Sequence, residues 1–278
     1  MRNLIRFGLW LLVFAVPAAH AELRFGIEPR GSAEETRSAF APLAEYLSRE
    51  LDEPVRLVIA ADFTDYGRKL QNREFDITFA APATILYSME IKGPELAAVA
   101  LDRDSGATLK GVFLVPKESP IESLAQLKGK KIAYVAKSSQ GYIVQSYTLR
   151  QAGVDPLKEV QAQFTQKLDR AVAAVLEGQA DAAGVGDVVF SKLKGKMDLS
   201  SLRVLSTSPA TPNWVVVSLR ADKTADVARA LHKLEKDSAP AKAVLGEKNF
   251  VGFQNIDVGE LDFLKAAVRA VKNQRPAE

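Results

Sequence analysis

The stretch KIAYVAKSSQGY, residues 131–142, decides the fold. Its first five residues are apolar and β-type, so they predict a strand, and residues 142–151 have the spacing of a helix. Gly153 stands where the C′ glycine of such a helix belongs, and Pro156 prevents the helix from continuing. A strand therefore runs through a small-residue turn directly into a helix N-terminus.

This turn has the composition of an anion-binding site. Ser138 and Ser139 supply hydroxyl groups, and the backbone N–H groups of Gln140 and Gly141 lie at the positive end of the helix dipole. A serine before a helix is also the ordinary N-cap, and taken alone that preference favours capping over ligand binding. The rest of the chain decides between the two interpretations.

The first 21 residues predict a cleaved signal peptide. Arg2 and Arg6 form a basic region, residues 7–16 are apolar, and Ala19-His20-Ala21 is an A-x-A cleavage site, so that Glu22 would begin the mature protein. The chain has no cysteine, which excludes disulfides and a lipoprotein anchor. We therefore expect a freely diffusing monomer in a bacterial periplasm.

The composition excludes one class of partner. The chain has 37 basic and 34 acidic residues, and losing Arg2 and Arg6 with the signal peptide would bring it closer to balance. No basic stripe with interleaved aromatic residues is present, so nucleic acid is not an expected partner. The 278-residue chain less its signal peptide is long enough for two modest domains or one large one.

The chain opens with a βαβ unit, predicted as a strand at 23–27, a helix at 33–50 and a strand at 54–59, which favours parallel pairing. A pattern of helix, strand and small-residue loop then occurs twice, at residues 63–84 and 167–187. The repetition indicates either two lobes of related build or two ordinary βα units of one sheet.

Two β-branched segments, 111–116 and 211–219, each separate one compositional block from the next and are predicted to cross between lobes. We expect an α/β protein of two lobes, each a mostly parallel sheet flanked by helices. Lobe one would comprise residues 22–111 and 217–278, and lobe two residues 112–216. The site should lie at the carboxyl ends of the strands, between the lobes.

At this point the chain resembles a known family, the periplasmic solute-binding proteins of phosphate, phosphite and phosphonate ABC transporters, which have the type II periplasmic binding protein fold. The resemblance covers nearly the whole mature chain. It is carried, in order, by the opening strand and loop 23–29, Asp65-Tyr66 ahead of Phe75-Asp76-Ile77, SLAQLKGK at 123–130, the turn 138–141 and QADA at 179–182. In that family the turn is typically Ser-Thr-Ser-Gly and holds phosphonate oxygens.

This chain departs from the family pattern at three positions. Gln140 replaces the third hydroxyl of the turn, Leu109 stands near the usual position of an aromatic residue, and Leu168 stands where the family usually has histidine. Losing a histidine donor removes a hydrogen bond of roughly 0.5–3 kcal/mol. The resemblance therefore identifies the family more firmly than the ligand.

Several other residues are candidate ligand contacts, each with an ordinary structural alternative. Tyr66 matches a family tyrosine or is a partly buried helix aromatic, and Asp187 would meet a ligand amino group or cap the following helix. Lys167, like Lys137, would supply a cation or is solvated surface. Thr84 and Asn213 are weaker candidates at the cleft rim.

The sequence favours a binding protein over an enzyme. It has no HExxH, GxSxG or Walker motif, its histidines are His20 and His232, and the usual ligands of a zinc site are missing. No cofactor and no metal are expected. The resemblance implies capture of a small anion or zwitterion by hinge closure and delivery to an ABC permease in the inner membrane; the alternative is delivery to a sensor kinase or other receptor.

Overall fold

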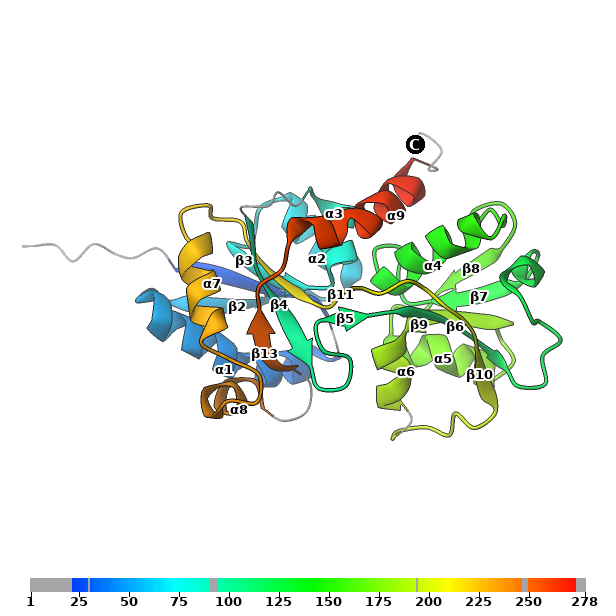
Figure 1. Ribbon diagram of the computed structural model, residues 1–278, viewed down its shortest axis with the longest axis horizontal. Coiled ribbons are helices and arrows are strands. Elements are labelled where there is room, and N and C mark those ends of the chain that lie inside the picture. Colours follow the sequence, from blue (N-terminus) through cyan, green and yellow to red (C-terminus); the bar gives the residue numbers. More distant parts are fainter. Residues whose placement is uncertain (1–21, 30, 91–94, 194, 247–249, 274–278) are drawn as a thin grey trace, which may run out of the picture.

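The protein folds as two α/β lobes side by side (Figure 1). The computed structural model describes residues 22–29, 31–90, 95–193, 195–246 and 250–273, so the predicted signal peptide lies outside the described residues. No helix among the residues described has the length and apolar character needed to cross a membrane.

Lobe one contains a six-stranded sheet in the order β13-β4-β12-β3-β1-β2. Its strands are β1 (Leu23–Ile27), β2 (Val55–Ile59), β3 (Ile77–Ala80), β4 (Leu96–Asp102), β12 (Val215–Ser218) and β13 (Phe250–Gln254). Its helices are α1 (Ala33–Leu51), α2 (Phe63–Gln71), α3 (Pro82–Ser88), α7 (Thr224–His232) and α8 (Ala239–Leu245).

Lobe two contains a five-stranded sheet in the order β10-β6-β9-β7-β8. Its strands are β6 (Gly111–Pro116), β7 (Lys131–Tyr134), β8 (Gln161–Phe164), β9 (Ala182–Gly186) and β10 (Leu202–Thr207). Its helices are α4 (Gln140–Gln151), α5 (Leu168–Leu176) and α6 (Asp187–Leu193), with a 3-10 turn, η2, at Leu124–Leu127.

The sheets are more mixed in direction than the sequence predicts. β1 pairs in parallel with β2 and β3, and β7 with β8 and β9, but β12, β13, β6 and β10 run antiparallel to their neighbours. The reason is topological, because β6 and β12 each enter their sheet from the other lobe. The α/β class holds, while parallel pairing is confined to one part of each sheet.

The two sheets share one plan. The order β2-β1-β3-β12 in lobe one matches β8-β7-β9-β6 in lobe two in spatial order and strand direction, although β12 is the last of its four strands along the chain and β6 the first. The repeated sequence pattern corresponds to equivalent elements of the two lobes, α2-β3-α3 and α5-β9-α6. This matching topology favours the interpretation as two lobes of related build.

Two short strands join the lobes. β5 (Thr108–Leu109) and β11 (Thr211–Pro212) pair antiparallel with each other, Leu109 opposite Thr211. β5 leads into β6 of lobe two, and β11 leads into β12 of lobe one. The lobe boundaries at 111/112 and 216/217 stay a prediction, next to these crossing strands.

The C-terminal helix α9 (Asp262–Lys272), preceded by the 3-10 turn η3 (Val258–Leu261), makes a third connection. It packs against α3 of lobe one and α4 of lobe two, and Figure 1 shows it in red running from one lobe toward the other. The rings of Phe263 on α9 and Tyr147 on α4 have centroids 5.4 Å apart. One apolar cluster consequently contains buried residues of both lobes together with Leu261 and Leu264.

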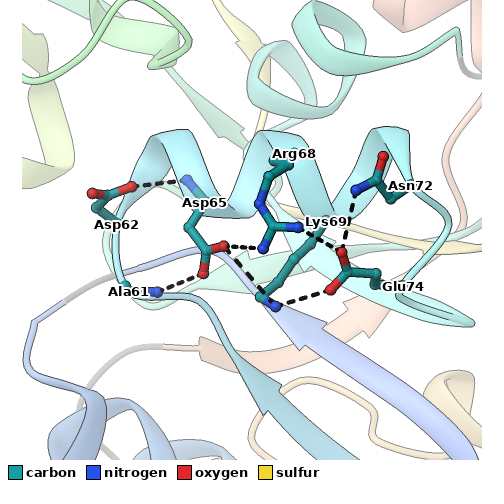
Figure 2. A network of polar contacts seen from close by, with 7 residues as sticks. All are labelled: Ala61, Asp62, Asp65, Arg68, Lys69, Asn72 and Glu74. Atoms are coloured by element: carbon teal, nitrogen blue, oxygen red, sulfur yellow. Dashed lines mark hydrogen bonds and ion pairs between the residues drawn. The ribbon is translucent and has the colours of Figure 1, made fainter.

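Helix α2 of lobe one carries a polar network (Figure 2). The Asp62 side chain caps the helix by accepting the N–H of Asp65 at 2.8 Å. Asp65 and Glu74 in turn hold Arg68 and Lys69 through ion pairs. Isolated surface pairs contribute little, so it is the Asp62 cap that defines where the helix begins. Phe63, the first residue of α2, is thereby placed at the cleft.

Candidate functional site

A cavity of about 100 Å³ lies between the lobes. Lobe one contributes Glu28, Pro29, Phe63 and Ala81, and lobe two contributes Val135, Ser139, Gln140, Gly141, Leu168, Val185, Gly186 and Val188. The remaining lining residues are strand ends of lobe one or belong to the crossing region: Asp102, Phe250, Leu109, Asn213 and Trp214. This position at the carboxyl ends of parallel strands is the usual one for ligands of open α/β sheets. The volume suits a small solute, since drug-sized pockets enclose roughly 300–1,000 Å³.

The N-terminus of α4 forms the polar part of the lobe-two wall. Ser139 is its N-cap in extended conformation, with φ −68° and ψ 144°. Gln140 and Gly141 come next, and their N–H groups have no acceptor within the helix because of their position. The positive end of a twelve-residue helix therefore faces the cavity, as expected for an anion-binding site.

Gly141 allows this helix to approach strand β9 closely. A Cβ atom at position 141 would lie 3.2 Å from the carbonyl oxygen of Gly184 and 3.3 Å from Cα of Val185. A larger residue would therefore have to displace the helix start or the strand.

The Ser139 hydroxyl already has local partners. It donates to the carbonyl oxygen of Ala136 at 2.7 Å and accepts the N–H of Tyr142 at 3.3 Å. Both contacts belong to the cap, so in this arrangement the N–H groups after Ser139 are better placed to meet a ligand than its hydroxyl.

The structure brings four of the nine predicted contacts to the cavity wall, Ser139, Gln140, Gly141 and Asn213. Asn213 is 3% exposed and braces the crossing region, since its Nδ2 donates to the Gly106 carbonyl at 3.1 Å and its Oδ1 accepts the Trp214 N–H at 2.8 Å. Its amide is therefore engaged with the backbone on both sides.

The other predicted contacts lie elsewhere, among them Ser138, which is half-buried next to the cap. Tyr66 is fully buried, and its hydroxyl is hydrogen-bonded to Thr78, while burial raises its pKa well above the ordinary value. Asp187 accepts the N–H groups of Lys110 and Val188, and Lys167 is exposed before α5.

The two apolar replacements, Leu109 and Leu168, both line the cavity. Leu109 belongs to the first crossing strand, and Leu168 is the first residue of α5. The positions at which the resemblance implies an aromatic residue and a histidine therefore line the site. The two leucines found there make this part of the wall apolar.

Sequence analysis missed two buried acids at the cavity. Glu28 is 3% exposed and accepts the Ala81 N–H at 2.8 Å and the Thr84 hydroxyl at 2.7 Å, which ties the β1 turn to the start of α3. Asp102, 2% exposed at the end of β4, accepts the N–H of Asp104 at 3.0 Å. Glu28 directly follows β1 and Asp102 is the last residue of β4, and this position at a strand end was the signal in the sequence that could have identified them.

Three aromatic lining residues were also missed, Phe63, Trp214 and Phe250. The rings of Trp214 and Phe250 have centroids 6.0 Å apart, although Trp214 immediately precedes β12 and Phe250 begins β13, and β4 lies between these two strands in the sheet. The closeness of these two rings depends on the order of strands in the sheet, and no local pattern in the sequence reveals that order. In the described part of the chain, no group of three His, Cys, Asp or Glu residues could hold a metal ion.

Two lobes, crossing strands and a small cavity between the lobes define the class of two-lobed solute-binding proteins. One family profile, described as "ABC transporter, phosphonate, periplasmic substrate-binding protein", matches residues 25–261. The chain belongs to this family. The resemblance and the fold class predicted from the sequence are confirmed, and the family description is that of a binding protein and not of an enzyme.

One curated relative is "Probable ABC transporter phosphite binding protein PhnD1" of Prochlorococcus marinus strain MIT 9301. It is 24% identical over 177 residues, which are 60% of this chain and 59% of that protein. The match thus spans less than two thirds of the length of the relative.

Solved structures share the fold at low identity. XAC2383 from Xanthomonas citri bound to ATP has a TM-score of 0.75 at 15% identity, covering 91% of this chain and 98% of that one. PhnD1 from Prochlorococcus marinus with methylphosphonate has a TM-score of 0.72 at 17% identity, covering 90% and 98%. PA3383, a phosphonate transporter binding protein from Pseudomonas aeruginosa, has a TM-score of 0.71 at 20% identity, covering 91% and 86%.

Proposed function

We propose that the protein is the periplasmic solute-binding component of an ABC transporter. It captures a small oxyanion or zwitterion of the phosphate, phosphite and phosphonate class between its lobes. The loaded, closed form then docks as a monomer on a permease in the inner membrane, after export through the cleaved signal peptide 1–21.

The observation that carries this proposal is the start of α4 at the cavity. The N–H groups of Gln140 and Gly141 and the dipole of a twelve-residue helix provide donors for oxyanion oxygens. The cavity is small and is lined by residues of both lobes, so a solute bound there contacts both. Such a solute shifts an open–closed equilibrium by its preference for the closed state.

The ligand class is tested by thermal shift with phosphate, phosphite, methylphosphonate, aminoethylphosphonate and sulfate. A specific ligand at a hundred times its Kd adds about 2.7 kcal/mol to stability. We expect one phosphorus compound to raise the Tm at this level and sulfate to leave it unchanged. A flat response to all the phosphorus compounds would contradict the proposed class.

The role of α4 is tested with a pair of glycine variants at opposite ends of the helix. Gly141→Ala pushes a Cβ against the Gly184 carbonyl and should weaken binding of the identified compound by calorimetry. Gly153→Ala meets no atom within 4 Å but is strained by its φ of +79°, so it should lower the Tm and leave affinity unchanged. Equal affinities in the two variants would remove α4 from the site.

A further inference from the structure

The Gln140 side chain bridges the two lobes. Gln140 is the first residue of α4 in lobe two and is 6% exposed. Its Nε2 donates to the Thr211 hydroxyl of the crossing strand β11 at 2.7 Å, and its Oε1 accepts the N–H of Ala83 in α3 of lobe one at 3.4 Å. The amide is thus joined to lobe one and to the crossing region by protein contacts.

Phe63 makes a second contact across the cleft. It begins α2 in lobe one and is 6% exposed. All other buried members of its apolar cluster lie between Val112 and Leu202, which is lobe two. The Phe63 ring is therefore buried against the lobe that faces it.

Both contacts would be lost if the lobes moved apart. Opening would expose the Phe63 ring to water and would separate the Gln140 amide from partners that are buried with it. Neither contact uses a ligand atom as a bridge. Side chains of the protein therefore provide part of the free energy of lobe closure that a bound solute would otherwise have to provide.

We propose that Gln140 and Phe63 form a clasp that holds the cleft closed, and that Gln140 is a positioning residue whose amide orders the lobes. A protein whose binding-competent state is already populated loses less of its intrinsic affinity to conformational change. The consequence for ligand binding rests on the proposed solute-binding function. The effect on lobe closure does not depend on the ligand.

The clasp is tested first by small-angle X-ray scattering of ligand-free protein. Wild type should scatter as the closed form, and Gln140→Ala should show a larger radius of gyration. Gln151→Ala is the matched control, because Gln151 is the same residue type at the exposed end of the same helix. Equal radii for wild type and Gln140→Ala would overturn the clasp.

The second measurement is the dissociation rate of methylphosphonate in stopped flow. It is followed by the fluorescence of Trp214, which lines the cavity and is the one tryptophan in the sequence from Glu22 onward. Loss of the neutral hydrogen bonds should accelerate release about three- to tenfold in Gln140→Ala and leave Gln151→Ala unchanged. Unchanged release in Gln140→Ala would count against the clasp. If wild type binds neither methylphosphonate nor the other phosphorus compounds, the proposed ligand class fails, and the scattering comparison alone decides the clasp.

Discussion

At the residue scale, the Ser139 hydroxyl contributes more to the stability of the turn than to ligand binding. Because the hydroxyl accepts the Tyr142 N–H and donates to Ala136, Ser139→Ala should lower the free energy of unfolding by about 1 kcal/mol in urea titrations. Ser138→Ala removes a neighbouring hydroxyl outside the cap and should change it by less than about 0.5 kcal/mol. Equal losses in both variants would contradict the capping role.

Leu168 faces the cavity at the position where the family resemblance implies histidine. Leu168→His introduces a donor there, and we expect methylphosphonate affinity to rise about two- to tenfold, the worth of one neutral hydrogen bond. The gain should be larger at pH 6 than at pH 8, since a histidine of ordinary pKa is more protonated at the lower pH.

Calorimetry at the two pH values measures this gain. Leu176→His at the other end of α5 is the control, because Leu176 does not line the cavity. If Leu168→His leaves affinity for phosphate, phosphite and methylphosphonate unchanged, position 168 has no part in ligand choice.

At the element scale, Asp76 joins the start of β3 to β1. Its carboxylate accepts the Arg24 backbone N–H at 2.8 Å and the guanidinium Nε at 2.9 Å. Burial raises the pKa of Asp76, but the hydrogen bonds from Arg24 outweigh this, so that the pKa lies below its ordinary value. The stability that this carboxylate contributes is thus complete above pH about 4 and is lost as pH falls through the lowered pKa.

Asp76→Asn should therefore cost about 1–3 kcal/mol of unfolding free energy at pH 7, because it removes a charge-assisted pair of hydrogen bonds. The difference from wild type should shrink as the pH falls below about 4. Urea titrations at pH 7, 5 and 3 measure it, and a difference that is constant over this range would contradict the linkage.

The sequence predicts which helices and strands form better than it predicts which of them lie side by side in the fold. The elements β1 to β3, β6, β7, α4, α5 and β9 follow from period and punctuation, as do the crossing segments, whereas β4 and β8 were not predicted. Residues 80–84 were expected to be a loop, but α3 begins at Pro82, because proline is tolerated in the first turn of a helix. Tyr66 matched a family position, yet its helix turns the ring inward to Thr78. Glu28 meets Ala81 and Thr84 through sheet pairing between segments far apart in sequence, which period and punctuation do not reveal.

At the scale of the whole molecule, the shared apolar cluster couples the lobes. Two-domain proteins often unfold in separate steps, but α9 contributes Leu264 to a cluster that contains residues of both lobes. We expect a single calorimetric transition. Leu264→Ala should remove about 2–5 kcal/mol of stability and so lower the Tm, while the transition remains single. Arg269→Ala, on the exposed side of α9, should leave the Tm unchanged. Two resolved transitions in wild type would contradict this coupling.

The position of β12 between β3 and β4 also has a consequence for biosynthesis. β3 and β4 are made early, but the strand that joins them is translated only after the whole of lobe two. The lobe-one sheet therefore cannot be completed until the ribosome has passed Ser218, and β13 and α9 follow later still. The nascent chain consequently remains without a finished first lobe for most of its synthesis, which fits the export that we propose.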